Sequence, residues 1–260
     1  MILNQVNLFS DNLGLRCSLN IILPQRTISE RRKSSKARFR TLYLLHGHSD
    51  DHTAWQRWTS VERYVEGLNL AVVMPAAHNS CYTDMVNGSK YFTYLTEELP
   101  ALLRDILPLS PEREDTFVAG LSMGGYGAFK MALSRPDLYA AAASLSGGVN
   151  IAEVVEEHPN DPGNAAWLQT MRGIFGDLAR VPGSRHDLFV LAEEVSRTKV
   201  KPRLFQYCGT EDFTYPGNIR FRDFARTLPL DLTYTEGPGD HTWKYWDKTI
   251  QQVLKWLPLQ

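Results

Sequence analysis

Hydrophobic and polar residues follow two patterns along the chain, and the change comes near residue 40. Before it, residues 2–9 and 15–23 are rich in β-forming side chains and flank a turn at 10–14, which predicts an antiparallel hairpin. After it, short apolar runs typical of strands buried on both faces lie at 41–45, 70–74, 116–119, 140–145, 204–207 and 232–235. Stretches with helical spacing alternate with these runs, at 60–66, 91–107, 124–134, 217–228 and 242–257. The pattern predicts an α/β fold: a mostly parallel central sheet with helices on both faces.

Two segments depart from this alternation. Residues 146–200 contain many Pro and Gly residues, which predicts a loop-rich insertion above the sheet and a candidate lid. The basic stretch at 30–38 has no interleaved aromatic residues, and we interpret it as a solvated loop between two strands. No linker is long enough to divide the chain, so we expect a single domain over residues 1–260.

Composition narrows the classes of partner. The 260 residues carry 28 Lys and Arg against 29 Asp and Glu, so a net charge of −1 argues against binding nucleic acid or an anionic membrane. The 3 cysteines are far apart and suggest neither a disulfide framework nor a paired CxxC zinc site. The chain has no apolar run of about 18 residues and no leader pattern at residues 1–14, so we expect a cytoplasmic location. A small-molecule partner is expected, no cofactor is called for, and self-association is left open.

The first chemical motif is a GxSxG sequence between a predicted strand and a predicted helix. Gly120-Leu121-Ser122-Met123-Gly124 follows the apolar run at 116–119 and precedes the helical stretch at 124–134. A serine on such a tight strand-to-helix turn projects its Oγ out of the sheet, so Ser122 is the predicted nucleophile. A second turn, with Ser144 and Ser146, lacks the preceding glycine and the following helix, and we interpret it as structural.

An acid and a histidine are expected after later strands, in that order along the chain. Asp212 follows the run at 204–207 and His241 follows the run at 232–235, so these are the predicted acid and base of a Ser-His-Asp triad. Glu211 remains an alternative acid, whereas Asp240 is badly placed to bond the ring of its neighbour and is interpreted as a helix N-cap. His158 and His186 lie in the irregular insertion and are expected at the surface.

The oxyanion hole is predicted from the loop after the first parallel strand. One donor is the backbone N–H of Met123, directly after the nucleophile, and the other is the N–H of His48, with Gly47 in reserve. The same loop, His46-Gly47-His48-Ser49-Asp50-Asp51-His52, offers a rival interpretation because it partly matches a zinc motif of the HxHxDH type. A zinc-dependent hydrolase is therefore an alternative, although our prediction assigns no metal.

The motifs together resemble the esterase D family of α/β-hydrolases, closest to bacterial short-chain acyl esterases of the tributyrin esterase type. The resemblance covers nearly the whole chain and is carried by Leu42–Gly47, Trp55, Ala71–Pro75, Tyr82–Asp84, Tyr94, Glu97–Pro100, Ala119–Gly127, His241–Trp243 and Trp246. It implies the α/β-hydrolase fold, and it implies a triad on Ser122, Asp212 and His241. It also implies a serine carboxylesterase for acetyl to butyryl esters. Feruloyl or cinnamoyl esterase, S-formylglutathione hydrolase and acyltransferase activities occur among relatives and stay open as alternatives.

Aromatic side chains next to these motifs are candidate walls of an acyl pocket. Trp55, Tyr82, Phe213 and Trp243 are predicted to bind the substrate, with core packing as the competing interpretation for each. Trp246 and Trp256 recur at helical spacing and are expected in the core. A pocket lined in this way would admit acyl groups of about two to four carbons.

Overall fold

A single mixed sheet organises the part of the chain that the computed structural model describes, residues 1–25, 38–158 and 161–259. Its strand order is β1-β2-β4-β3-β5-β6-β7-β8. The strands are β1 (Ile2–Ser10), β2 (Leu15–Leu23), β3 (Arg40–Leu45), β4 (Leu70–Pro75), β5 (Thr116–Leu121), β6 (Ala141–Leu145), β7 (Arg203–Gly209) and β8 (Leu232–Gly237). The interpretation of the basic stretch as a loop falls on residues 30–37, which lie outside the described residues.

The pairing of the strands confirms the predicted architecture. β1 pairs antiparallel with β2, from Ile2 opposite Leu23 to Ser10 opposite Leu15, and β2 pairs antiparallel with β4. From β4 to β8 all neighbouring strands are parallel. This is the α/β-hydrolase fold, with an antiparallel N-terminal hairpin on a parallel sheet. The carboxyl ends of β3, β5, β7 and β8 lie at one edge, because parallel strands point the same way.

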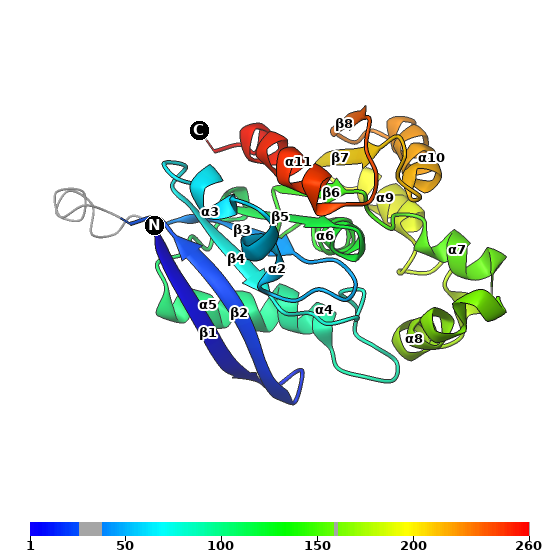
Figure 1. The fold of residues 1–260 in the computed structure, drawn as a ribbon, viewed down its shortest axis with the longest axis horizontal. Helices are drawn as coiled ribbons and strands as arrows, with labels where there is room; N and C mark the ends of the chain where they lie inside the picture. The colour runs from blue at the N-terminus through cyan, green and yellow to red at the C-terminus, as the bar shows by residue number, and fades with distance from the viewer. Residues whose placement is uncertain (26–37, 159–160, 260) are drawn as a thin grey trace.

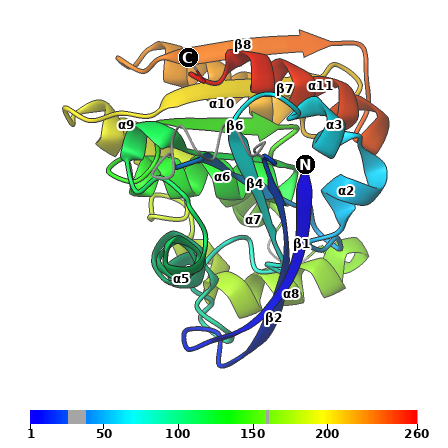
Figure 2. The same ribbon diagram turned by 90° about the vertical axis from the view of Figure 1, so that its left-hand side faces the viewer.

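Helices cover both faces of the sheet (Figures 1 and 2). They are α2 (Ala54–Trp58), α3 (Val61–Tyr64), α4 (Tyr91–Thr93), α5 (Leu99–Ile106), α6 (Met123–Ser134), α7 (Ile151–Glu157), α8 (Ala165–Phe175), α9 (Leu188–Ser196), α10 (Tyr215–Arg226) and α11 (Trp243–Trp256). Successive strand residues point to opposite faces, so Tyr43 joins the core under α6 while Leu42 and Leu44 join the core under α11. No described helix is long and apolar enough to cross a membrane.

The insertion at 146–200 corrects the sequence-based expectation. It contains α7, α8 and α9 together with short 3-10 turns at Pro162–Asn164 and Leu178–Arg180, so more of it is helical than loop and the prediction of a loop-rich segment was wrong. Its glycines and prolines lie mostly between the helices, and Gly176 ends α8 with a positive φ of 77°. Within α8, Leu168, Met171 and Ile174 recur at helical spacing and are buried.

The two insertion histidines have different surroundings. His158 is exposed, as expected. His186 is half-buried, with its ring centroid 5.0 Å from that of Phe175, so its surface assignment was wrong.

Candidate active site

Ser122 occupies the sharp turn between β5 and α6. Its backbone has φ 52° and ψ −116°, a conformation that costs free energy in a residue other than glycine. The two motif glycines make the turn sterically feasible: a Cβ on Gly120 would lie 2.4 Å from the Gly124 carbonyl oxygen, and a Cβ on Gly124 would lie 2.6 Å from the His46 carbonyl oxygen. The predicted spacing of the motif therefore has a local physical cause.

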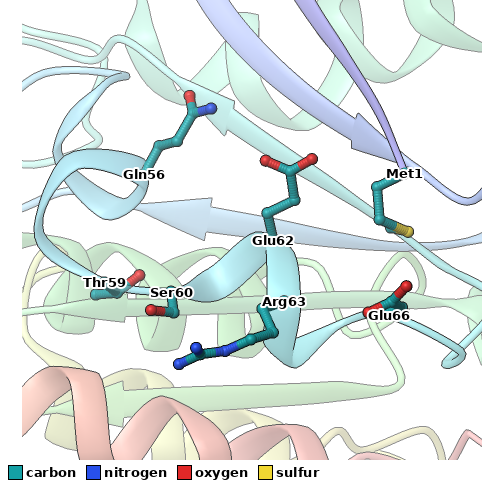
Figure 3. A pocket seen from close by; sticks show the side chains of 7 residues that line it. All are labelled: Met1, Gln56, Thr59, Ser60, Glu62, Arg63 and Glu66. Atoms are coloured by element: carbon teal, nitrogen blue, oxygen red, sulfur yellow. The ribbon is translucent and has the colours of Figure 1, made fainter.

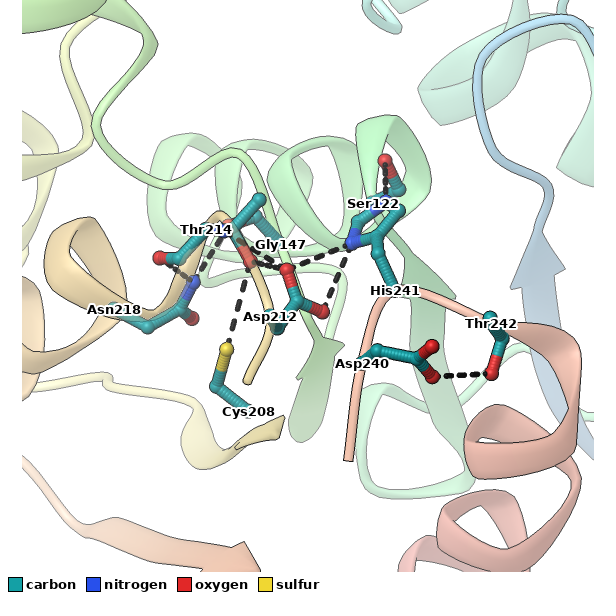
Figure 4. Close-up of polar contacts among 9 residues, drawn as sticks. All are labelled: Ser122, Gly147, Cys208, Asp212, Thr214, Asn218, Asp240, His241 and Thr242. Atoms are coloured by element: carbon teal, nitrogen blue, oxygen red, sulfur yellow. Dashed lines mark hydrogen bonds and ion pairs between the residues drawn. The ribbon is translucent and has the colours of Figure 1, made fainter. Parts of the chain in front are cut away.

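Three side chains from different strand ends meet in one hydrogen-bonded row (Figure 4). The Oγ of Ser122 lies 2.9 Å from Nε2 of His241. The Nδ1 of the same ring lies 2.9 Å from each carboxylate oxygen of Asp212. Asp212 follows β7 and His241 follows β8, so the fold brings together residues 119 and 29 positions apart in the chain.

The environment of Asp212 favours its ionised form. Its side chain is fully buried, and Oδ1 also accepts hydrogen bonds of 2.8 Å from the backbone N–H and the hydroxyl of Thr214. Burial raises the pKa of this carboxyl, but the hydrogen bonds from His241 and Thr214 outweigh it, so the net pKa is below its usual value. Trp246 stands edge-on to the His241 ring with centroids 4.9 Å apart.

Neither alternative carboxylate takes this position. Glu211 accepts hydrogen bonds from the backbone N–H of Gly239 and from the hydroxyl of Thr210. Asp240 accepts a hydrogen bond of 2.8 Å from the Thr242 hydroxyl (Figure 4). The N-cap prediction for Asp240 was wrong, because Thr242 is the N-cap residue of α11 and no side chain caps that terminus.

The loop after β3 lies beside the nucleophile. A Cβ built on Gly47 would be 3.7 Å from the Cβ of Ser122, so the backbone there approaches closely. His46 is buried, its Nδ1 is 2.7 Å from the Gly47 carbonyl oxygen, and its Nε2 accepts the Ala77 N–H at 3.0 Å. Burial lowers the pKa of His46 to about 4, so its ring is neutral and serves to hold the loop.

The donor set of this loop does not fit the zinc interpretation. Both ring nitrogens of His46 already have backbone partners. Within residues 1–25, 38–158 and 161–259, no group of three or more His, Cys, Asp or Glu side chains is arranged to hold a metal ion. The HGHSDDH segment begins the loop after β3, whose first histidine is held by backbone hydrogen bonds.

A cavity of about 720 Å³ opens over Ser122 and His241. One side is formed by Cys81, Met123 and Tyr126, and the other by apolar side chains of α7 and α8. Those helical residues, Ile151, Val154, Trp167 and Met171, were missed by the sequence analysis, and their helical spacing was the available signal. Phe213 also lines the cavity and is 76% exposed, with its ring 4.4 Å from that of His241.

The other predicted pocket aromatics are placed elsewhere. Trp55, Tyr82 and Trp243 do not line this cavity, so their assignment to the substrate pocket was wrong. Trp55 is buried, with its ring edge-on to Trp243 at 5.2 Å, and donates from Nε1 to the Leu45 carbonyl at 2.9 Å. The buried Tyr82 donates its hydroxyl to the His46 carbonyl at 2.7 Å. Trp55 and Tyr82 thus brace the end of β3 and the start of the loop that follows it.

A buried serine turn and a separate cavity complete the description of this part of the molecule. The turn with Ser144 and Ser146 is buried, and next to it the Gly148 N–H donates to the Ser122 carbonyl at 3.2 Å, which is a supporting role. A separate cavity of about 390 Å³ lies between the N-terminus and α2–α3 (Figure 3). Its lining of Met1, Gln56, Thr59, Ser60, Glu62, Arg63 and Glu66 contains no histidine or cysteine beside its hydroxyl groups.

Comparison with known proteins points in the same direction as the geometry. The family model described as putative esterase matches residues 10–257. An acetyl esterase from Caldicellulosiruptor saccharolyticus is 30% identical over 99% of this chain and 98% of its own length. Two solved structures from Staphylococcus aureus are also similar. The fluorophosphonate-binding serine hydrolase F has a TM-score of 0.89 at 34% identity, covering 100% of this chain and 98% of its own. An S-formylglutathione hydrolase has a TM-score of 0.86 at 33% identity, covering both chains in full.

Proposed function

The chain belongs to the putative esterase family, and from this membership we propose that it hydrolyses esters of short acyl groups through an acyl-enzyme on Ser122. It is a serine esterase. The proposed acyl-enzyme mechanism rests on the row of hydrogen bonds from Ser122 through His241 to Asp212. Such a row is what an alcohol needs to become a nucleophile at neutral pH.

The proposed reaction has two steps. Nε2 of His241 takes the hydroxyl proton as Ser122 Oγ bonds to the ester carbonyl carbon, and Asp212 holds the ring by its Nδ1–H. His241 then returns the proton to the departing alcohol, which leaves the acyl group on Ser122. Water enters, gives a proton to His241 and attacks the acyl carbon, and collapse of this intermediate releases the carboxylic acid and restores Ser122.

The oxyanion of each tetrahedral intermediate is assigned to two backbone N–H groups. Met123 is the first residue of α6, where an N–H has no acceptor one turn earlier in the helix, and helix N-termini favour negative charge. The second donor is the N–H of His48, with Gly47 in reserve. The close approach of this loop to Ser122 supports that choice.

The cavity supports an uncharged, partly apolar substrate. Ile151, Val154 and Met171 contribute apolar surface to it, and its volume of about 720 Å³ has room for a short acyl group together with an alcohol group. We assign the short acyl group from the acetyl esterase relative, which is similar over nearly its whole length.

A panel of esters tests the proposal. Rates are measured on p-nitrophenyl esters with acyl chains of about two to twelve carbons, and the proposal expects a maximum at about two to four carbons. A maximum at about eight carbons or more contradicts the short-chain assignment. Acetylated sugars, feruloyl esters and triglycerides complete the panel, with Ser122→Ala as the control for background hydrolysis.

One alternative activity has a specific observation behind it. The S-formylglutathione hydrolase structure is 33% identical over both full chains, so this thioester belongs in the panel. If kcat/KM for S-formylglutathione exceeds that for every oxygen ester by about a hundredfold or more, the thioester is the preferred substrate class. Product analysis with an added alcohol separates hydrolysis from acyl transfer, because water and alcohol compete for the same acyl-enzyme.

A further inference from the structure

Lys130 is a charged residue outside the hydrogen-bonded row of Ser122, His241 and Asp212, and it is almost completely buried. It lies in α6, the helix that begins after the nucleophile, and only 4% of its surface is exposed. Among the described residues, no carboxylate forms an ion pair with its ammonium group. Burying a lysine without an acidic partner is costly, so the structure must compensate the amine in another way.

The contacts of Lys130 satisfy only some of the hydrogen-bond donors of its ammonium group. Its Nζ donates to the Thr83 hydroxyl and lies 3.1 Å from Nδ1 of His186. The rings of Phe92, Tyr126 and Phe175 surround it at 5.5 to 6.0 Å from their centroids. An ammonium group has three donors, and these contacts use two of them. One N–H of the charged form therefore remains available for an acceptor.

A third cavity is lined in part by Lys130. It has a volume of about 250 Å³ and is lined by Thr83, Asp84, Phe92, Lys130, Ser134, Arg135, Arg185 and His186. Its basic side chains are Lys130, Arg135 and Arg185, and Arg135 is ion-paired with Glu97 and Asp137 at 3.2 and 2.8 Å. Its one carboxylate is that of Asp84, whose oxygens accept from the N–H and hydroxyl of Thr93 at 2.9 and 2.7 Å. Arg185 is 72% exposed and meets its acidic neighbour, Glu194, only at 3.9 Å.

We propose that this cavity is a binding site for a small oxyanion, a carboxylate or a phosphate. Lys130 donates to the anion from the floor of the cavity, and Arg185 closes on it from the rim. Ser134, one turn further along α6, adds a hydroxyl donor. The volume admits a small anion and excludes a nucleotide or a peptide. The site is independent of the proposed esterase reaction, because none of its residues belongs to the catalytic row.

The site is connected to the active-site cavity by two short links. Tyr126, one turn before Lys130 on α6, lines the active-site cavity and donates its hydroxyl to the His186 carbonyl at 2.8 Å. Thr83 lies two residues after Cys81, which lines the same cavity. An anion that draws Lys130 toward itself acts on the segments that carry Tyr126 and Cys81.

The protonation of Lys130 provides a specific signature. Burial lowers the pKa of Lys130 to about 7, and a bound anion favours the charged amine. Acetate should therefore bind more tightly at about pH 6 than at about pH 9. Burial lowers the pKa of His186 to about 4 and raises that of Cys81 to about 12, so neither changes charge in this interval. Asp84, Arg135 and Arg185 also face the site.

The test measures thermal stabilisation by sodium acetate and by sodium phosphate at constant ionic strength, with sodium chloride as the reference. We expect a saturable rise in Tm for the wild type and for Lys255→Met, an exposed lysine on α11 that serves as the matched control. Lys130→Met should bind at least about tenfold more weakly, and Arg185→Gln should bind several-fold more weakly. The two salts show which class of anion is preferred.

Two outcomes would overturn the proposal. The first is the absence of a saturable response in the wild type. The second is an equal response in the wild type and a folded Lys130→Met, which would mean that Lys130 serves only to hold Thr83 and His186. If Lys130→Met does not fold, the decision rests on Arg185→Gln and on the pH series. The site is also excluded if Arg185→Gln binds the anion as tightly as the wild type does and acetate binds no more tightly at about pH 6 than at about pH 9.

Discussion

Two regions face each other across the active-site cavity, and they are built differently. On one side, the strand-end loops hold Ser122, His241 and Asp212 in hydrogen bonds of 2.9 Å. Behind the loop after β3, the side chains of Trp55 and Tyr82 donate to backbone carbonyls. On the other side, α7 and α8 contribute mainly apolar side chains. Glu153 of α7 pairs with Arg220, and the backbone N–H groups of residues 86 and 87 donate to carbonyls of α8. The hydrogen bonds of the row depend on distance and angle. An apolar wall depends on packing, which tolerates more substitution of its side chains.

The largest effect is expected at the nucleophile. Ser122→Ala should lower kcat by on the order of 10⁴–10⁶ with the fold intact, because it removes the hydroxyl that lies 2.9 Å from Nε2 of His241. Steady-state kinetics and circular dichroism check this. Ser146→Ala is the matched control on the competing turn, and it should retain most of the activity. Near-normal turnover by Ser122→Ala would remove the basis of the proposed mechanism.

The next effect tests the choice of acid. Asp212→Asn should lower kcat by roughly 10³–10⁴, because an amide no longer holds the reactive tautomer of the His241 ring. Asp240→Asn is the control, since this neighbouring carboxylate bonds only the Thr242 hydroxyl, and its kcat should stay within about threefold of the wild type. The opposite order of effects would reassign the acid.

A smaller effect is expected behind the oxyanion loop. Tyr82→Phe removes the hydroxyl that donates to the His46 carbonyl and leaves a buried acceptor unpaired. We expect a loss of about 1 kcal/mol in the free energy of unfolding, and a fall of about tenfold in kcat with little change in KM. Tyr234→Phe, whose hydroxyl bonds Glu236 on β8, is the control. A change in KM alone would place Tyr82 at the substrate.

The smallest effect on turnover is expected at the helical wall. Trp167→Ala should raise KM several-fold and change kcat by less than about threefold, because the wall binds substrate without taking part in the bond changes. Trp58→Ala on α2, where the ring is exposed and remote from the cavity, controls for loss of a tryptophan. A fall in kcat of about a hundredfold would show that the wall also positions the reacting atoms. The two regions would then no longer divide into one for chemistry and one for binding.

The strands and the hydrogen-bonded row of Ser122, His241 and Asp212 were predictable because their sequence signals are local. Buried parallel strands are continuously apolar, and the strand ranges expected at 70–74 and 204–207 lie within β4 and β7. The GxSxG motif reports a steric requirement of its own turn, which is visible in the close approaches of Gly120 and Gly124. The acid and histidine follow from strand order, since each comes directly after an apolar run.

The walls of the cavity were not predictable in the same way. Trp55 and Tyr82 belong to the motifs of the family resemblance, yet they are buried and donate to the backbone carbonyls of Leu45 and His46. Trp167 and Met171 are far from every motif and still line the cavity. Pro and Gly between short helices concealed the helical period of the insertion, which led to the loop-rich prediction.

The sequence by itself therefore determined the α/β architecture and the residues of the row Ser122, His241 and Asp212, because strand periodicity and turn sterics act over a few neighbouring residues. Only the tertiary structure decided which side chains line the cavity over Ser122 and which brace the loop after β3. It also placed Lys130 against a cavity without an acidic partner among the described residues. These outcomes depend on the direction in which a side chain leaves the backbone and on what packs against it from distant parts of the chain, and no local pattern encodes either.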